Sequence, residues 1–168
     1  MNKLETPKEA GVIVMHDLTT DSLVLTQRST EMPEHPGEIC FPGGRWQEGD
    51  DNLYATALRE LREELDIDSS RIQLQRSMAL ERTLTGYIIQ PWLVTIESID
   101  PYKANLAEVS AVFSLPLAEV SNLSNYQEVT VKRYGVDIKS YQYMASTYFV
   151  WGATARIMMQ LSKKRVME

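Results

Sequence analysis

The sequence predicts an α+β fold in which a mixed β-sheet lies between helices. Short β-rich runs, separated by turn residues, recur over most of the chain. Two amphipathic segments, one central and one near the end, have the apolar spacing of helices. Because the 168 residues are 43% hydrophobic and 24% charged, we expect a single domain over residues 1–168 with an ample core.

The first half of the chain is predicted to contain a strand pair, a long loop and a helix. Residues 11–16 and 22–29 are β-rich and are separated by DLTTD, which is typical of a hairpin. Residues 30–52 contain seven prolines and glycines, so we expect an irregular loop, of a length that is usually functional. Residues 53–65 are expected to form a helix. Its predicted buried stripe consists of Tyr54, Ala57, Leu58, Leu61 and Leu65.

The second half is predicted to extend the sheet and to close the fold with a helix. Its β-rich runs lie at residues 71–80, 87–97, 111–120 and 127–144. The third run is expected to give way to a short helix near Pro116, and the last to turn near Gly135. Residues 148–164 are predicted to form an amphipathic helix with a basic end, whose aromatic residues pack on the sheet.

Composition excludes several classes of protein. A net charge of −6 argues against nonspecific nucleic-acid binding. We expect no membrane-spanning helix, because no apolar run approaches about 18 residues, and the first residues lack a signal-peptide pattern. Cys40, the only cysteine, is expected to be a small core residue. We therefore predict a cytoplasmic protein, with the oligomeric state left open between a monomer and a homodimer.

The stretch RELREEL, residues 59–65, places three glutamates on one side of the predicted helix. At about 100° per residue, Glu60, Glu63 and Glu64 share one arc, where like charges cost about 0.2–0.5 kcal/mol per pair. The ordinary explanation is an exposed acidic face partly neutralised by Arg59 and Arg62. The functional explanation is a site for Mg²⁺ or Mn²⁺, which prefer carboxylate oxygens. The helix alone leaves both open.

The segment FPGGRWQEGDDNLYATALRELREELDI, residues 41–67, resembles the Nudix box. This motif is a glycine-opened loop-helix-loop that ends in Arg-Glu, an apolar residue, any residue and then Glu-Glu. The pattern is specific because it requires glycines, an arginine and three glutamates together at set positions. The resemblance therefore favours the cation site and implies a Nudix α/β/α fold. Three features depart from the general pattern. The box is one residue longer, its loop acid is Asp50 or Asp51, and Asp66 replaces the glycine after the helix.

Residues 24–44, VLTQRSTEMPEHPGEICFPGG, are similar to the signature upstream of the box in coenzyme A pyrophosphatases. That subfamily also has the longer box and the loop aspartate, and the resemblance extends from about residue 10 to residue 160. Pro33 stands where the signature usually has arginine. The resemblance implies metal-dependent hydrolysis of coenzyme A or its thioesters, giving adenosine 3',5'-bisphosphate and a 4'-phosphopantetheine product.

The same resemblance implies roles for individual residues. The expected ligands of Mg²⁺ or Mn²⁺ are Glu60, Glu63, Glu64 and a backbone carbonyl of Gly44 or Gly43. Arg59 is assigned to orienting the box. The general base is left open among Glu60, Glu64 and Glu108, the last of which lies in the loop just before the β-rich stretch VSAVF. Independently of the resemblance, Arg28 and Arg45 are candidates for binding substrate phosphates by their charge and loop position, and Gly43 and Gly44 by allowing close backbone approach.

Two alternatives to the coenzyme A assignment stay open. One is the same reaction on another nucleoside diphosphate derivative, such as ADP-ribose, NADH or a dinucleoside polyphosphate. The other is a non-catalytic Nudix domain that senses a ligand. The intact glutamates Glu60, Glu63 and Glu64 count against a silent domain, because a pure binder has no need of them.

Overall fold

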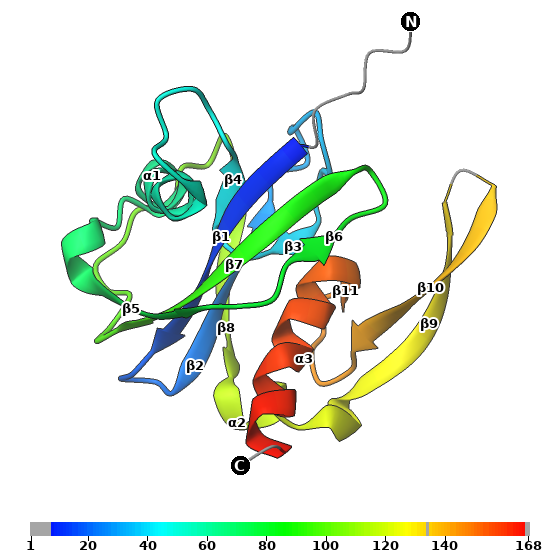
Figure 1. Ribbon diagram of the computed structural model, residues 1–168. Coiled ribbons are helices and arrows are strands. Elements are labelled where there is room, and N and C mark those ends of the chain that lie inside the picture. The colour runs from blue at the N-terminus through cyan, green and yellow to red at the C-terminus, as the bar shows by residue number, and fades with distance from the viewer. Residues whose placement is uncertain (1–7, 134, 167–168) are drawn as a thin grey trace, which may run out of the picture.

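The computed structural model describes residues 8–133 and 135–166 (Figure 1). The strands are β1 (Lys8–Asp17), β2 (Ser22–Arg28), β3 (Ile39–Cys40), β4 (Gly43–Arg45), β5 (Ile72–Ser77), β6 (Glu81–Arg82), β7 (Tyr87–Ile96), β8 (Val109–Pro116), β9 (Tyr126–Arg133), β10 (Val136–Tyr143) and β11 (Val150–Trp151). The helices are α1 (Leu53–Leu65), α2 (Leu117–Val120) and α3 (Gly152–Val166), with short 3-10 turns at Ser69–Arg71 and Leu123–Asn125. None of the described helices is long and apolar enough to cross a membrane.

The main sheet is mixed, as the sequence predicts. Strand β1 runs parallel to β7 over its whole length and antiparallel to β2 and β4. Strand β2 in turn pairs with β3 and β8, while β5 and β6 pair with β7. A second, smaller sheet has the order β11-β10-β9, and its β9–β10 hairpin extends away from the main sheet (Figure 1). The hairpin formed by β9 and β10 turns near Gly135, as predicted.

Helices cover both faces of the main sheet, which confirms the predicted layers. Ile13 and Met15 of β1 point to the face covered by α1, where they are fully buried with Leu61. Val14 points to the other face, where it belongs to a second cluster that includes Ile157 of α3. In Figure 1, α1 lies on one side of the β1–β7 pair and α3 on the other. Strand alternation thus builds two cores, one for each helix.

Helix α1 has the predicted bounds, residues 53–65, because local signals set both ends. The side chain of Asn52 caps the start by accepting a hydrogen bond of 2.8 Å from the Ala55 N–H. The helix ends at Asp66, which has the left-handed conformation (φ 55°) that a glycine usually supplies. The aspartate at this position is therefore compatible with the motif.

Three predicted segments differ from the structure. The loop at residues 30–52 contains the short strands β3 and β4, and the final helix begins at Gly152 instead of residue 148. The strand expected over residues 71–80 ends at Ser77. The glycine at position 43 is what allows β4 to pair with β1. A Cβ on Gly43 would lie 2.3 Å from the Gly11 carbonyl oxygen, so a larger residue would keep the two strands apart.

The aromatic residues before α3 also differ from expectation in part. Tyr148 packs on the sheet as predicted, with its ring stacked on Phe113 of β8 at a centroid distance of 3.9 Å. Trp151 belongs to β11, which pairs with β10. Phe149 leaves 54% of its surface exposed. The three residues therefore lie in the segment that leads into the helix and not on the helix itself.

Candidate active site

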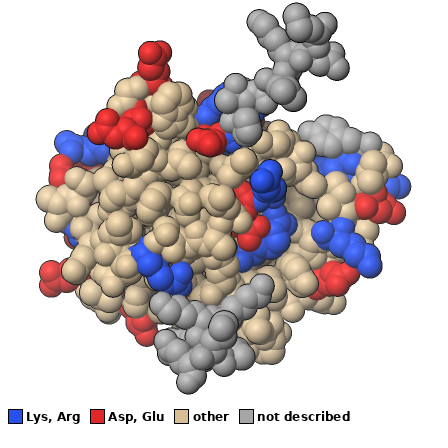
Figure 2. All heavy atoms as spheres, viewed as in Figure 1, with Lys and Arg blue, Asp and Glu red and all other residues tan. Residues whose placement is uncertain are grey.

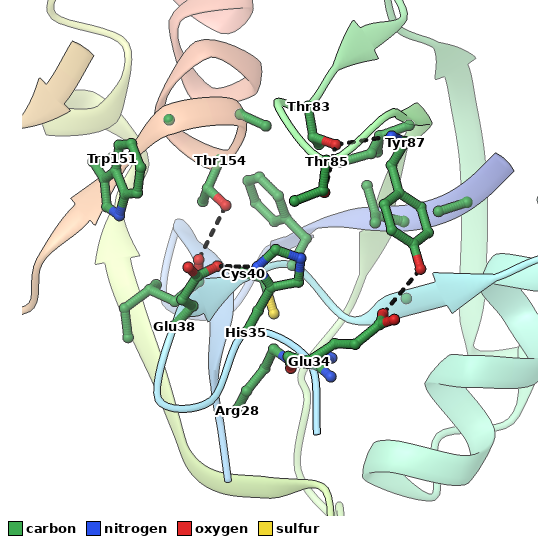
Figure 3. Close-up of a pocket in the computed structure, with 18 of the residues that line it drawn as sticks. Arg28, Glu34, His35, Glu38, Cys40, Thr83, Thr85, Tyr87, Trp151 and Thr154 are labelled. Carbon is green, nitrogen blue, oxygen red and sulfur yellow. Dashed lines mark hydrogen bonds and ion pairs between the residues drawn. The ribbon is translucent and has the colours of Figure 1, made fainter. Parts of the chain in front are cut away.

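An open cleft of about 1440 Å³ lies between the main sheet and the wall formed by the β9–β10 hairpin and the start of α3. Figure 3 shows the loop residues Glu34 and His35 between Tyr87 on one side and Trp151 on the other, with Arg28 from the end of β2 beside them. The predicted site residues that line this cleft are Arg28, Gly43, Gly44, Arg45, Glu60, Glu64 and Glu108. Arg59 and Glu63 are not among its lining residues.

Three carboxylates converge at one end of the cleft. One oxygen from each of Glu60, Glu64 and Glu108 lies within 4.8 Å of the other two. Glu64 is only 7% exposed, and the Gly43 N–H donates a hydrogen bond of 3.4 Å to its Oε1. Burial raises the pKa of Glu64 well above its ordinary value, and the charges of Glu60 and Glu108 raise that pKa further.

This acidic cluster fits a hard divalent cation. Ionised carboxylates so close together repel one another, and burial removes the water that would screen them. A divalent cation that takes oxygen ligands removes both costs. Burial also raises the pKa of Glu60, while Arg59 beside it opposes that shift. The donor set is therefore of the kind that Mg²⁺ and Mn²⁺ use.

Glu108 reaches the cluster from a loop that is fastened to the end of α1. The Lys103 N–H donates to the Leu65 carbonyl at 2.9 Å, and the Asn105 N–H donates to the Glu64 carbonyl at 2.8 Å. The Asn105 carbonyl then accepts a hydrogen bond of 3.0 Å from the Glu108 N–H. These contacts place Glu108 next to Glu64, although the two residues are 44 positions apart in the sequence.

Gly44 gives Glu60 the space that it occupies. A Cβ on Gly44 would lie 2.5 Å from Cδ of Glu60, which is too short for any real contact. A side chain at this position would therefore push the Glu60 carboxylate out of its place in the cluster. The carbonyl of Gly44 as a metal ligand stays a prediction.

Arg59 connects the loop of the motif to its helix. Its Nε and Nη2 donate to the two carboxylate oxygens of Asp50 at 2.9 and 3.0 Å. Its Nη1 donates to Glu60 Oε1 at 3.0 Å, and Nη2 also donates to the Arg45 carbonyl at 3.1 Å. The loop acid of the motif is thus Asp50. The Arg59 guanidinium holds the pKa of that carboxyl well below its usual range.

Glu63 lies apart from the cluster in this structure. Its side chain is 48% exposed and pairs with Arg59, with Nη1 and Oε2 3.3 Å apart. The structure therefore brings two of the three predicted glutamate ligands together with Glu108. A ligand role for Glu63 stays a prediction and requires its carboxylate to leave Arg59.

Asp50→Asn is expected to lower the free energy of unfolding by about 1.5–3 kcal/mol, the range for a hydrogen bond to a charged group. Both partners are shielded, with Asp50 8% and Arg59 24% exposed. Folding lowers the pKa of Asp50. The ionised carboxylate therefore stabilises the fold at pH values above its ordinary pKa of about 3.9, and this stabilisation is progressively lost as the pH falls below that value. Urea denaturation of wild type and variant should therefore differ at neutral pH and converge in acid.

The matched control is Asp51→Asn, because Asp51 is the adjacent residue and is exposed. Its stability should stay within about 0.5 kcal/mol of wild type. Equal stability of Asp50→Asn and wild type at neutral pH would contradict a structural role for the Asp50–Arg59 pair.

Both predicted arginines of the substrate site lie in the cleft. Arg28 Nε donates to the Glu34 carbonyl at 3.1 Å, which fixes the arginine against the loop that follows β2. The Arg45 guanidinium lies 5.9 Å from the centre of the Tyr87 ring, and Lys8 Nζ lies 5.4 Å from the same centre. These positions place three cations along the cleft wall.

Sequence reasoning did not single out Lys8 or Tyr87. No local motif marks either residue, and they become neighbours only because β1 and β7 are paired in parallel with Lys8 opposite Tyr87. Cys40 also lines the cleft, with its sulfur 3.6 Å from Thr26 Oγ1. Burial raises the pKa of its thiol to about 11, so a reactive thiolate is not favoured there.

Comparison with known proteins identifies the family. The sequence model of the NUDIX domain matches residues 6–132. The chain belongs to the Nudix family. An uncharacterized Nudix hydrolase, NudL, from Shigella boydii serotype 4 is 37% identical over 140 residues, which is 83% of this chain and 73% of the relative. NudL from Escherichia coli O6:H1 has the same identity and coverage.

Solved structures of Nudix proteins share the fold. A MutT/nudix family protein from Enterococcus faecalis superposes with a TM-score of 0.61 at 17% identity, covering 100% of this chain and 65% of that one. A C. elegans Ap4A hydrolase in a binary complex gives a TM-score of 0.56 at 18% identity, covering 65% of this chain and 80% of that one. Identities this low bear on the fold alone.

Membership of the Nudix family gives the class of reaction. This Nudix protein is a pyrophosphatase that hydrolyses a diphosphate bond in a small-molecule substrate. Nudix enzymes generally use divalent metal ions, and the cluster of Glu60, Glu64 and Glu108 is an acidic site that suits one.

Proposed function

We propose that this Nudix hydrolase cleaves the diphosphate of coenzyme A or its thioesters, using Mg²⁺ or Mn²⁺. The observation that carries the proposal is the position of the loop after β2. The segment that resembles the coenzyme A pyrophosphatase signature, residues 24–44, contributes Arg28, Met32, Glu34 and His35 to the same cleft as the acidic cluster. A substrate arm held by that loop would therefore occupy the same cleft as the predicted metal site.

The reaction needs a base, a charged substrate site and a cation. Water attacks one phosphorus, the bridging P–O bond breaks, and the base takes a proton from the water, so that two phosphate monoesters leave. A divalent cation, when bound, neutralises developing charge and acidifies the attacking water. Glu60, Glu63, Glu64 and the Gly44 carbonyl are its proposed ligands. The structure adds Glu108 as a further carboxylate beside Glu60 and Glu64 that can hold the cation or accept the proton.

The charge of the cleft suits an anionic substrate. The full sequence has 17 lysines and arginines and 23 acidic residues, and among the described residues eight of the former line the cleft but only five of the latter. Three of those five are the proposed metal cluster. Figure 2 shows Lys and Arg side chains on the β9–β10 hairpin and on the surface between the hairpin and the main sheet. An acidic protein thus gathers its cations where a diphosphate is expected to bind.

Arg28→Ala and Arg45→Ala are each expected to raise KM for coenzyme A by about tenfold to a hundredfold, with a smaller effect on kcat. Both arginines line the cleft, whereas Pro33 is exposed and is not among the lining residues. We therefore expect Pro33→Arg to change kcat/KM little. Steady-state kinetics of the three variants test this. Unchanged KM in both alanine variants, with an improved kcat/KM in Pro33→Arg, would contradict the assignment of the cations.

A panel of diphosphates tests the substrate itself. Coenzyme A, ADP-ribose, NADH and a dinucleoside polyphosphate are incubated with Mg²⁺ and with Mn²⁺, and the products are resolved by chromatography. We expect the highest kcat/KM with coenzyme A or a thioester, and adenosine 3',5'-bisphosphate as a product. Faster cleavage of another member would replace the coenzyme A assignment and leave the Nudix pyrophosphatase activity intact.

A further inference from the structure

We propose, on the basis of the nucleoside diphosphate class of substrate above, that Phe149 and Trp151 form a stacking subsite for the nucleobase. These two residues lie immediately before α3 and line the cleft, and Figure 3 shows Trp151 on the opposite side from Tyr87. They come from the segment that was expected to be part of a helix packed on the sheet. The structure instead leaves one of the rings facing open space.

The exposed side chain of Phe149 is a candidate contact surface for a ligand. The ring is 54% exposed although it lies in a cleft, and its centroid is 5.8 Å from that of Trp151 with the planes 25° apart. The preceding residue, Tyr148, covers its own face by stacking on Phe113 at 3.9 Å. The segment thus packs one aromatic ring against the sheet, yet it holds Phe149 outward next to a second, nearly parallel ring. Such a surface is complementary to a flat, apolar group.

The guanidinium of Arg133, beside the two rings, indicates that the ligand carries negative charge. The Arg133 guanidinium of β9 lies 5.2 Å from the centre of the Trp151 ring, and its Nη2 is 3.8 Å from Glu38 Oε1. The arginine is therefore held next to the aromatic pair while 47% of its side chain remains exposed. A planar group that is joined to negative charge matches both features, and a nucleotide is such a ligand.

A hydrogen bond ties the start of α3 to the segment that leads to the acidic cluster. Thr154 Oγ1, in the first turn of α3, donates a hydrogen bond of 3.0 Å to the Ile39 carbonyl. Ile39 is four residues before Gly43, which contacts Glu64. Four residues span at most about 14 Å even when fully extended. A diphosphate at the cluster can therefore extend a base toward the start of α3.

Binding of AMP and of ribose 5-phosphate to the full chain in Mg²⁺, measured by calorimetry, isolates the contribution of the base. Wild type should bind AMP more tightly than ribose 5-phosphate. Phe149→Ala and Phe149→Leu should reduce that ratio of affinities by about fivefold to tenfold, the lower part of the range for stacking. Phe149→Tyr keeps a ring and should retain the ratio. Because no bond is cleaved, the result does not depend on whether coenzyme A is the substrate.

Leu84→Ala is the matched control, because Leu84 also lines the cleft and is also 54% exposed, but lies in the turn before β7. It should leave the ratio unchanged. The proposal is overturned if wild type binds both probes equally, or if Phe149→Leu binds AMP as well as wild type does. An equal loss in Leu84→Ala would also overturn it, because the effect would then be a general property of apolar surface in the cleft.

Discussion

Glu64→Gln is expected to lower kcat for diphosphate hydrolysis by at least about 10²–10⁴-fold, the range for loss of an acid–base group. Glu64 is the most buried member of the acidic cluster, and its carboxylate lies beside those of Glu60 and Glu108. Glutamine keeps the size of the side chain but removes the charge that a divalent cation requires. The loss should therefore come from the site and not from the fold.

Stability measurements separate these two causes. Burial and neighbouring charges raise the pKa of Glu64 in the folded state, so its ionised form opposes folding at neutral pH when no metal is bound. Metal-free Glu64→Gln should consequently be at least as stable as wild type in thermal denaturation. The opposing effect in wild type should fade as the pH falls and the carboxyl takes up a proton.

Two companion variants complete this test. Glu97→Gln alters an exposed glutamate just after β7 and should retain wild-type activity. Glu63→Gln should cost a factor similar to Glu64→Gln if the carboxylate of Glu63 leaves Arg59 to bind the cation. Wild-type kcat in Glu64→Gln, or a loss as large in Glu97→Gln, would contradict the role of the cluster.

Glu108→Gln is expected to lower kcat by about 10²–10⁴-fold with little change in metal affinity, if Glu108 accepts the proton of the attacking water. Its backbone is anchored through Asn105 to the Glu64 carbonyl, so the substitution should leave the loop in place. Activity assays and Mn²⁺ titration of the same protein provide the two quantities.

The combination of results assigns the residue. A fall in kcat alone identifies Glu108 as the base, whereas a parallel fall in metal affinity identifies it as a ligand. Wild-type values for both quantities would place the base within the motif, at Glu60 or Glu64. Conversely, a large loss of activity with unaltered metal binding in Glu60→Gln would favour Glu60 over Glu108.

Local signals explain what the sequence predicts well. The bounds of α1, its apolar stripe and its acidic face follow from helical periodicity, and Asn52 and Asp66 mark its ends with side-chain and backbone preferences. The strand pairs at the start and near Gly135 follow from β-rich runs separated by turn residues. Each of these features depends on residues close together in the chain.

The sequence does not predict features that depend on contacts between residues far apart in the chain. Strands β3 and β4 have two and three residues and exist because they pair with β2 and β1. Lys8 enters the cleft through the parallel pairing of β1 with β7. Phe149, with its exposed side chain, lies before the helix because α3 begins only at Gly152, which has a φ of +67°. No pattern within these short segments distinguishes such outcomes.

The candidate site was predicted in part for the same reason. Glu60 and Glu64 follow from the helix and the resemblance, and Glu108 was a candidate from its place before a strand. Only the fold shows that the Asn105 contacts bring Glu108 to Glu64. The exposed position of Glu63 on Arg59 was not foreseen, because helical spacing gives the direction of a side chain but not its partner.

The position of bound Mn²⁺ tests the central claim most directly. Anomalous diffraction from crystals of the full chain grown with Mn²⁺ locates the ion without reference to activity. We predict an anomalous peak among the carboxylates of Glu60, Glu64 and Glu108, which converge in the cleft. A fully active protein whose manganese lies elsewhere, with no peak at these three carboxylates, would contradict the account.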